Sequence, residues 1–275
     1  NGYDGNSIQT LERVYKYYYF IIRERNMKLL HRLWLKINDI GEYDVKYGAW
    51  KIYQIMYTNN LIKGGNLFTD NDIVKKGGRP YIKCQFIHNG KSTEEMRFSG
   101  ETDFNFSTQK KRELCRSRYE NYKKILERDL AGEGILEIYL EMLNECSQMY
   151  HSQDNISIML QSGNMQGAKG AIGLDRLDVW LLILDMKYRY NINMLQNHCT
   201  MENCSEIEKY LNLFDDVYDY ASTIYHINSE LVDKLIESGK RPLDSATNII
   251  TYMSLAKEFW NQKHAFIENQ LKYKQ

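Results

Sequence analysis

The sequence has little proline and no long apolar run. It contains 2 prolines in 275 residues, and proline is the residue that most strongly interrupts a helix. It has no stretch of about 18 consecutive apolar residues, the length of a membrane-spanning helix, and no secretory signal pattern. We therefore expect a largely helical protein that is neither secreted nor inserted in a membrane.

Cysteine is also sparse. The 5 cysteines are odd in number and do not form the dense framework of a small disulfide-linked domain. A chain of this length is long enough to bury a large core without disulfides. The pattern is typical of reduced thiols, so we expect a cytoplasmic protein.

The chain has no excess of charge of either sign. Its 36 basic residues balance 36 acidic ones, which excludes attraction of the whole protein to a polyanion. The distribution is uneven, because residues 75–128 hold 14 Lys or Arg against 7 Asp or Glu, and residues 201–245 hold 4 against 10. This asymmetry fits a protein partner or a homo-oligomer, and it equally fits two solvated faces of opposite sign.

The hydrophobic pattern predicts an α+β fold that is predominantly helical, with a small antiparallel hairpin or sheet. Residues 81–88 alternate as a strand, the Asn89-Gly90 pair predicts a hairpin turn, and the return strand is expected over 93–99. A short buried strand is expected over 155–161. Helices are expected over residues 7–38, 44–57, 107–130, 135–150, 174–188, 205–227, 230–237 and 245–271.

Two serines are expected to begin helices. Ser107 precedes a charged segment, and Ser205 opens a capping-box pattern. Residues 59–80 are rich in glycine and asparagine and predict a loop. We divide the chain into residues 1–106, an N-terminal helical region plus β-hairpin, and residues 107–275, a helical core domain with a glycine-rich loop.

The most informative stretch is residues 162–178, SGNMQGAKGAIGLDRLD, between a predicted strand and a long apolar helix. Its four glycines let backbone amides approach a ligand, and the following helix start favours an anion. The spacing matches neither a Walker loop, where Ser or Thr would follow Lys169, nor the dinucleotide pattern G-x-G-x-x-G. One interpretation is a phosphate bound by loop amides. The other is a tight strand-to-helix turn whose glycines relieve crowding.

Polar side chains in this stretch are the candidate ligand contacts. Lys169 and Arg176 would contact the anion, two amide side chains would read it, and Asp178 would orient Arg176. Asp175 and Asp178 share one face of the helix start, where carboxylates also complement the helix dipole. The expected ligand-binding residues are Asn164, Gln166, Lys169, Gly170, Asp175, Arg176 and Asp178.

Other sequence patterns give weaker evidence of a functional site. His198, Cys199 and Cys204 are zinc-ligand types, but their spacing is loose and a fourth ligand is missing, so we expect incidental cysteines and neither a metal nor a cofactor. The basic helix expected over 107–130 carries tyrosines, as nucleic-acid-binding helices do, yet its interspersed glutamates favour a solvated face. No nucleophile motif such as G-x-S-x-G is present, and whether the protein is an enzyme stays open.

Several motifs of the C-terminal part carry a resemblance. The strand and turn NISIMLQSGN precede an Ala-Lys-Gly step (168–170) and an Asp-Arg-Leu-Asp helix start (175–178). An aromatic–acidic helix and a closing helix follow at 213–233 and 241–263. Over residues 150–270 this pattern resembles an uncharacterised family of bacterial genomes and prophages. That family has no assigned activity, so the resemblance implies the location of a site and a phage–bacterium setting.

Two hypotheses from different classes follow. The leading one is a cytoplasmic protein that binds an anionic ligand, a nucleotide or nucleic-acid phosphate, at the glycine-rich loop and helix start, in phage–bacterium conflict. The alternative is a non-enzymatic interaction module, an anti-defence inhibitor or an oligomeric scaffold, because the 22 tyrosines suit protein interfaces. Two-metal chemistry has little support, because Asp175 and Asp178 lack further acidic partners in the sequence.

Overall fold

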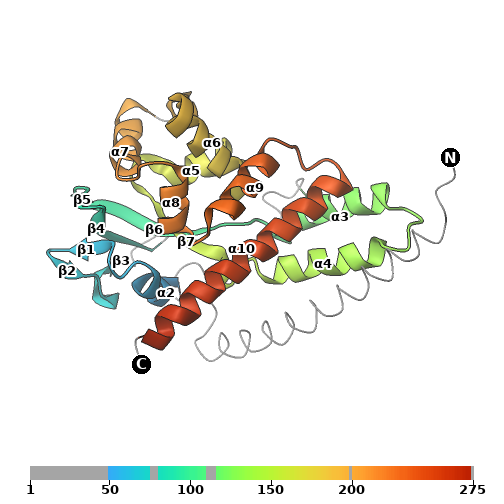
Figure 1. Cartoon of the computed structure of the whole chain (residues 1–275), viewed down its shortest axis with the longest axis horizontal. Coiled ribbons are helices and arrows are strands. Elements are labelled where there is room, and N and C mark those ends of the chain that lie inside the picture. The colour runs from blue at the N-terminus through green and yellow to red at the C-terminus, as the bar shows by residue number, and fades with distance from the viewer. Residues whose placement is uncertain (1–48, 75–79, 110–115, 198–199, 274–275) are drawn as a thin grey trace. The chain divides into compact units, whose positions relative to one another are not determined.

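The computed structural model describes residues 49–74, 80–109, 116–197 and 200–273. All of them lie within one compact unit, Asp44–Gln275 (Figure 1). The helix expected over 7–38 and the start of the one expected over 44–57 lie outside the described residues. Within this unit the prediction of an α+β, predominantly helical fold is confirmed.

The described strands form one seven-stranded antiparallel sheet. Its main path runs β2 (Asn66–Leu67), β1 (Leu61–Lys63), β4 (Tyr81–His88), β6 (Met96–Thr102) and β7 (Ile156–Leu160). Two further short strands, β3 (Ile73–Val74) and β5 (Lys91–Ser92), also pair with β4. The sheet therefore joins strands from either side of residue 106.

The hairpin prediction is confirmed, and the loop prediction for 59–80 is wrong in part. Asn89 and Gly90 have φ values of 48° and 74°, as a tight hairpin turn requires. Gly64 and Gly65 have the same left-handed conformation and connect β1 to β2. This glycine pair, which predicts a loop, is a second hairpin turn. The two strands that it connects are too short to show an alternation of apolar and polar residues.

One face of the sheet builds the core. Ile82, Cys84 and Phe86 of β4 are fully buried, as the alternation of a strand with one covered face requires. Phe86 packs edge-on against Tyr210, with ring centroids 5.4 Å apart. Phe98 of β6 contacts the same tyrosine. Aromatic side chains therefore fix the helix that carries Tyr210 to the sheet.

Strand β7 is an edge strand whose residues are all buried. Side chains bond its backbone where a further strand would otherwise pair. The Tyr57 hydroxyl accepts from the Ile158 amide at 3.3 Å, and the Tyr53 hydroxyl donates to the Ser157 carbonyl at 3.2 Å. Lys263 donates to the Ile156 carbonyl at 2.7 Å. These contacts satisfy polar backbone groups that water cannot reach.

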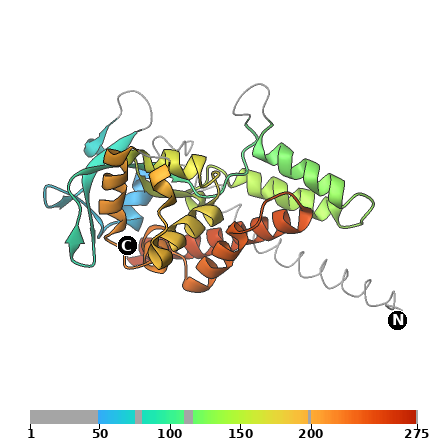
Figure 2. The same cartoon turned by 90° about the horizontal axis from the view of Figure 1, so that it is seen from above.

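The helices surround the sheet and extend beyond it. In both views α3 and α4 lie side by side, and the long α10 runs from them to α2 (Figures 1 and 2). Within the described ranges, no helix combines the length and apolar character that a bilayer crossing needs. The helices are α2 (Ala49–Met56), α3 (Arg118–Asp129), α4 (Leu136–Gln148), α5 (Met165–Ala171), α6 (Leu177–Tyr190), α7 (Met201–Leu211), α8 (Val217–Ile224), α9 (Ser229–Gly239) and α10 (Ala246–Tyr273).

Both serine-cap predictions are wrong. Helix α3 begins after Ser117, whose hydroxyl accepts from the Glu120 amide at 3.0 Å, while Ser107 bonds the Gln109 amide in the preceding segment. The helix expected over 205–227 is two helices, because α7 begins after Thr200 and α8 begins after a second cap residue, Asp216. Helices α4, α9 and α10 lie within two residues of their expected bounds.

Candidate functional site

The glycine-rich segment (residues 162–178) is mostly helical rather than a loop. A single 3-10 turn, Ser162–Asn164, leads into α5, and a short turn connects α5 to α6. Gly163 packs so closely that an added Cβ would lie 2.5 Å from the Asn203 carbonyl oxygen, and at Gly173 it would lie 2.5 Å from that of Lys169. At both positions glycine therefore permits close backbone packing.

The two amide side chains expected to read a ligand lie apart. Asn164 is exposed and adopts a left-handed conformation, with φ 59°. The Gln166 amide donates to the Ser99 hydroxyl and, at 3.3 Å, to the Gly100 carbonyl. Gln166 therefore fixes α5 to strand β6.

Lys169 is buried although it carries a charge. Its side chain is 1% exposed, and its ammonium donates to the Thr102 carbonyl at the end of β6. Among the described residues, no carboxylate lies within ion-pair distance of this ammonium. A buried cation whose bonded partner is a neutral carbonyl keeps most of its desolvation cost.

Arg176 and Asp178 form a closed pair at the start of α6. The Arg176 guanidinium donates from Nε to Oδ1 at 3.0 Å and from Nη2 to Oδ2 at 2.6 Å. Its Nη1 and Nη2 also donate to the Arg241 carbonyl at 3.1 Å, and Ser238 donates to Asp178 Oδ2 at 2.9 Å. Asp178 thus orients Arg176, and together they anchor α6 to the connection between α9 and α10.

The turn before this pair is held in an unfavourable conformation. Leu174 and Asp175 are consecutive left-handed residues, with φ values of 55° and 58°. Each such non-glycine residue costs about 1–2 kcal/mol. Hydrogen bonds from two distant segments hold the turn: Arg118 Nη2 donates to the Leu174 carbonyl at 3.0 Å, and Asn105 Nδ2 donates to Asp175 Oδ2 at 3.2 Å.

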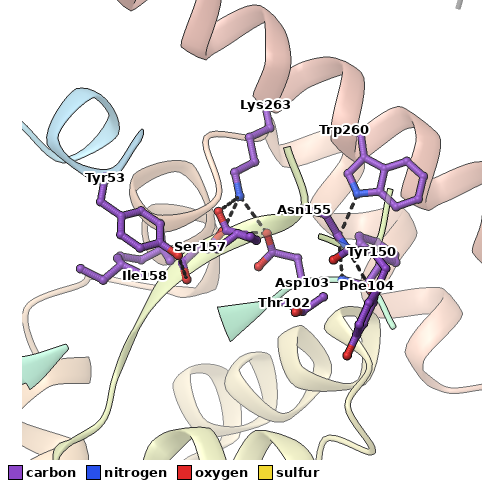
Figure 3. Close-up of polar contacts among 12 residues, drawn as sticks. Tyr53, Thr102, Asp103, Phe104, Tyr150, Asn155, Ser157, Ile158, Trp260 and Lys263 are labelled. Atoms are coloured by element: carbon purple, nitrogen blue, oxygen red, sulfur yellow. Dashed lines mark hydrogen bonds and ion pairs between the residues drawn. The ribbon is translucent and has the colours of Figure 1, made fainter. Parts of the chain in front are cut away.

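A second polar cluster, which the sequence reasoning missed, lies where strands β6 and β7 meet α10 (Figure 3). Lys263 Nζ donates to Asp103 Oδ2 at 2.8 Å and to Ser157 Oγ at 2.6 Å, and Ser157 Oγ donates to Asp103 Oδ2 at 2.8 Å. Burial lowers the pKa of Lys263, and the Asp103 carboxylate opposes that change. We call these three residues the strand-end network.

Asn155 extends this network toward α10. Its side chain accepts from the Phe104 amide at 2.9 Å and donates to the Phe104 carbonyl at 2.9 Å, so it replaces a neighbouring strand. Trp260 Nε1 donates to the same Asn155 oxygen at 2.9 Å (Figure 3). We call residues 102–105 the strand-end segment. Side chains from α5, α10 and β7 are bonded to it, and its last residue, Asn105, is hydrogen-bonded to the turn before α6.

The strand-end network has the residue types of a nucleophilic site but not the access. Lys263 is 0% exposed and Ser157 is 1% exposed, so a substrate has no approach to the Ser157 hydroxyl. The ammonium of Lys263 donates to Asp103, Ser157 and the Ile156 carbonyl, and it therefore has no lone pair with which to act as a base. The arrangement braces the fold.

A sequence signal for this network did exist. Lys263 stands on the buried face of α10 together with Phe259 and Ile267, at helical spacing. A lysine within an apolar stripe must find a buried partner. Its partner Asp103 is 160 residues away in the chain, so the sequence could have marked Lys263 but not what it contacts.

The remaining predicted patterns give no site. His198 and Cys199 lie outside the described residues, and within the described part no three His, Cys, Asp or Glu side chains gather to hold a metal. The basic cluster at Lys110–Arg112 also lies outside them. Part of the charge asymmetry is compensated within the chain, because Lys91 pairs with Asp215 at 3.6 Å. The His88 ring is also hydrogen-bonded to Asp219, at 2.8 Å.

Comparison of the chain with models of protein families, with curated proteins and with solved structures finds no match. The prophage-family resemblance of residues 150–270 stays a prediction. The function is therefore argued from the geometry of the glycine-rich segment and the strand-end segment.

Proposed function

We propose that the protein binds a phosphate-bearing anionic ligand, a nucleotide or a nucleic-acid phosphate, at Lys169. The observation that carries the proposal is the buried ammonium of Lys169, bonded to the neutral carbonyl of Thr102. Within ion-pair distance of this ammonium, an anionic ligand would supply the negative charge that no described carboxylate supplies there. The setting of phage–bacterium conflict belongs to the same proposal and is supported by the sequence resemblance alone.

Two other buried cations in the described part of the chain support this choice by contrast. Arg176 is bonded to Asp178 through two hydrogen bonds, and Lys263 is bonded to Asp103. A buried ion pair offsets much of its desolvation cost through its own attraction. Of these buried cations, Lys169 would therefore gain most from the negative charge of a ligand. Arg176 would instead stabilise the start of α6 through its bonds to Asp178.

The neighbourhood of Lys169 contains further polar groups for such a ligand. Gly170 follows Lys169 and has space beside it, since an added Cβ would meet only Asp175 Oδ1, at 3.8 Å. Asn105, the last residue of the strand-end segment, donates to the Asp175 carboxylate, and this bond weakens the repulsion between that carboxylate and an anion. Lysine recognises phosphate as a point charge rather than through a planar fork, so we expect charge to matter more than the exact ligand geometry.

Thermal-shift titration tests the proposal. Inorganic phosphate, pyrophosphate and ATP are added to the wild type, to Lys169→Met and to a control variant, Lys240→Met, whose lysine is exposed at the end of α9. We expect a rise of Tm with ligand concentration in the wild type and in the control, and its loss in Lys169→Met. An equal rise in Lys169→Met, or no rise with any of the three probes, would overturn the proposal.

A second function, a protein-interaction module, is favoured by one observation. Large apolar side chains are exposed at the connection between α6 and α7: Tyr190 is 66% exposed, Ile192 46% and Met201 93%. Large exposed apolar side chains are found at interaction surfaces. If this surface joins two copies of the chain, light scattering will give a concentration-dependent mass that Tyr190→Glu lowers to that of a monomer. A monomeric mass at all concentrations would contradict it.

A further inference from the structure

The turn that connects α5 to α6 is bonded to the Lys169 backbone and to the strand-end segment that holds the Lys169 ammonium. The Asp175 amide donates to the Lys169 carbonyl at 3.2 Å, on the backbone side. The Asp175 carboxylate accepts from Asn105 at 3.2 Å, and Arg176 forms an isolated bridge with Phe104. These last two contacts lie on the strand-end segment, where the Lys169 ammonium is bonded to Thr102. The turn therefore adjoins Lys169 at its backbone and also adjoins the segment to which the Lys169 ammonium is bonded.

Little burial energy holds the middle of this turn in place. Leu174, the bulkiest residue of the turn, is 49% exposed, so its strained left-handed conformation is not offset by packing in the core. Polar contacts hold it instead, and one of them comes from the partly exposed Arg118 of α3. Strained left-handed residues that distant contacts hold in place are typical of ligand clamps and switch regions.

We infer that residues 173–175 form a gate over Lys169, which opens to admit the anionic ligand and closes around it. The inference rests on the proposed function and adds its regulation. In the closed state Lys169 is 1% exposed, so a ligand reaches its ammonium only after a neighbouring segment moves. The turn is the adjoining segment with the most backbone strain, since it holds two consecutive left-handed residues. Relief of that strain favours opening.

Hydrogen–deuterium exchange at the Asp175 and Arg176 amides measures the gate. Both amides are bonded within the closed turn, to the Lys169 and Gly173 carbonyls, so they exchange when it opens. We expect Leu174→Gly, which removes the left-handed strain, to slow their exchange about fivefold. Arg118→Met removes a clamp and should speed exchange by a similar factor. Ala171→Gly, at an exposed position of α5, is the matched control, since it adds a glycine without relieving strain and should not slow exchange.

The same measurement with pyrophosphate tests whether ligand binding closes the gate. We expect saturating pyrophosphate to slow exchange at both amides in the wild type and to have no effect in Lys169→Met. If pyrophosphate raises Tm through Lys169 but leaves the turn amides unchanged, or if Leu174→Gly and Arg118→Met leave their exchange unchanged, the gate is overturned and the proposed function stands. If no probe raises Tm, both fall.

Discussion

Two buried lysines reach the same strand end, and they differ in what they meet there. Lys263 of α10 meets the Asp103 carboxylate and the Ser157 hydroxyl. Lys169 of α5 meets the Thr102 carbonyl, one residue before Asp103. A cation with its own carboxylate is part of the fold, because removal of either partner leaves a buried charge. A cation bonded to a neutral group has a charge that no carboxylate compensates, and an anionic ligand can compensate it. The comparison thus separates a brace from a candidate binding group.

The largest effect is expected at the paired lysine. Asp103→Asn and Lys263→Met should each lower the free energy of unfolding by about 3–5 kcal/mol, since each leaves the other charge buried without its partner. The double variant should lose much less than the sum of the two. Urea denaturation of the four proteins measures this coupling. Additive losses would show that the two residues act independently and would break the comparison.

A smaller effect is expected from pH. Burial, together with the charge of Lys263, lowers the pKa of His226 to about 3. Below its ordinary pKa of 6.5 the unfolded chain therefore takes up a proton that the folded protein does not, and stability falls as the pH drops from about 6.5 toward 3. The loss from this residue is at most about 1.4 kcal/mol per pH unit.

Denaturation at pH 7 and pH 5 checks this difference. His226→Gln should lose less stability between the two pH values than the wild type. Lys169→Met should behave as the wild type, because Lys263 rather than Lys169 adds to the lowering of the His226 pKa. An unchanged pH dependence in His226→Gln would show that the histidine is not held neutral by its surroundings.

The smallest effect on stability is expected at Lys169. Lys169→Met keeps the length and apolar stem of the side chain and breaks no ion pair among the described residues, so the free energy of unfolding should change by less than about 1 kcal/mol, with a gain as the favoured sign. Urea denaturation without ligand measures it. A loss as large as that of Lys263→Met would place both lysines in the fold and remove the distinction between them.

The sequence predicted local structure well where a signal was short-range. The alternation over 81–88 and the Asn89-Gly90 pair fixed β4 and its turn, because both depend on neighbouring residues alone. The caps were missed where several candidates compete, since Thr200 rather than Ser205 bonds the first free amides of α7. The pairing of β7 with β6 joins residues more than 50 apart in sequence, such as Thr102 and Ile156, and no local pattern indicates such a partner.

The binding role of residues 162–178 stays a prediction, and the arrangement of their side chains could be predicted only in part. Arg176 and Asp178 are two residues apart, so their pairing could be proposed from the sequence, and the structure contains it. No local pattern indicates that the Arg241 carbonyl and the Ser238 hydroxyl also bond this pair. The expected contact of Arg176 with a ligand stays a prediction, and in the structure its guanidinium donates to the Asp178 carboxylate and to the Arg241 carbonyl.

Composition and periodicity by themselves determined the α+β class, the helical content and a concentration of glycine and charge between one strand and one apolar helix. They do so because backbone preference and amphipathic spacing act over a few residues. Only the tertiary structure decided which charges are paired. Lys263 and Asp103 are 160 residues apart, and Lys169 and Thr102 are 67 apart. The energy of a buried charge depends on the partner that folding brings to it.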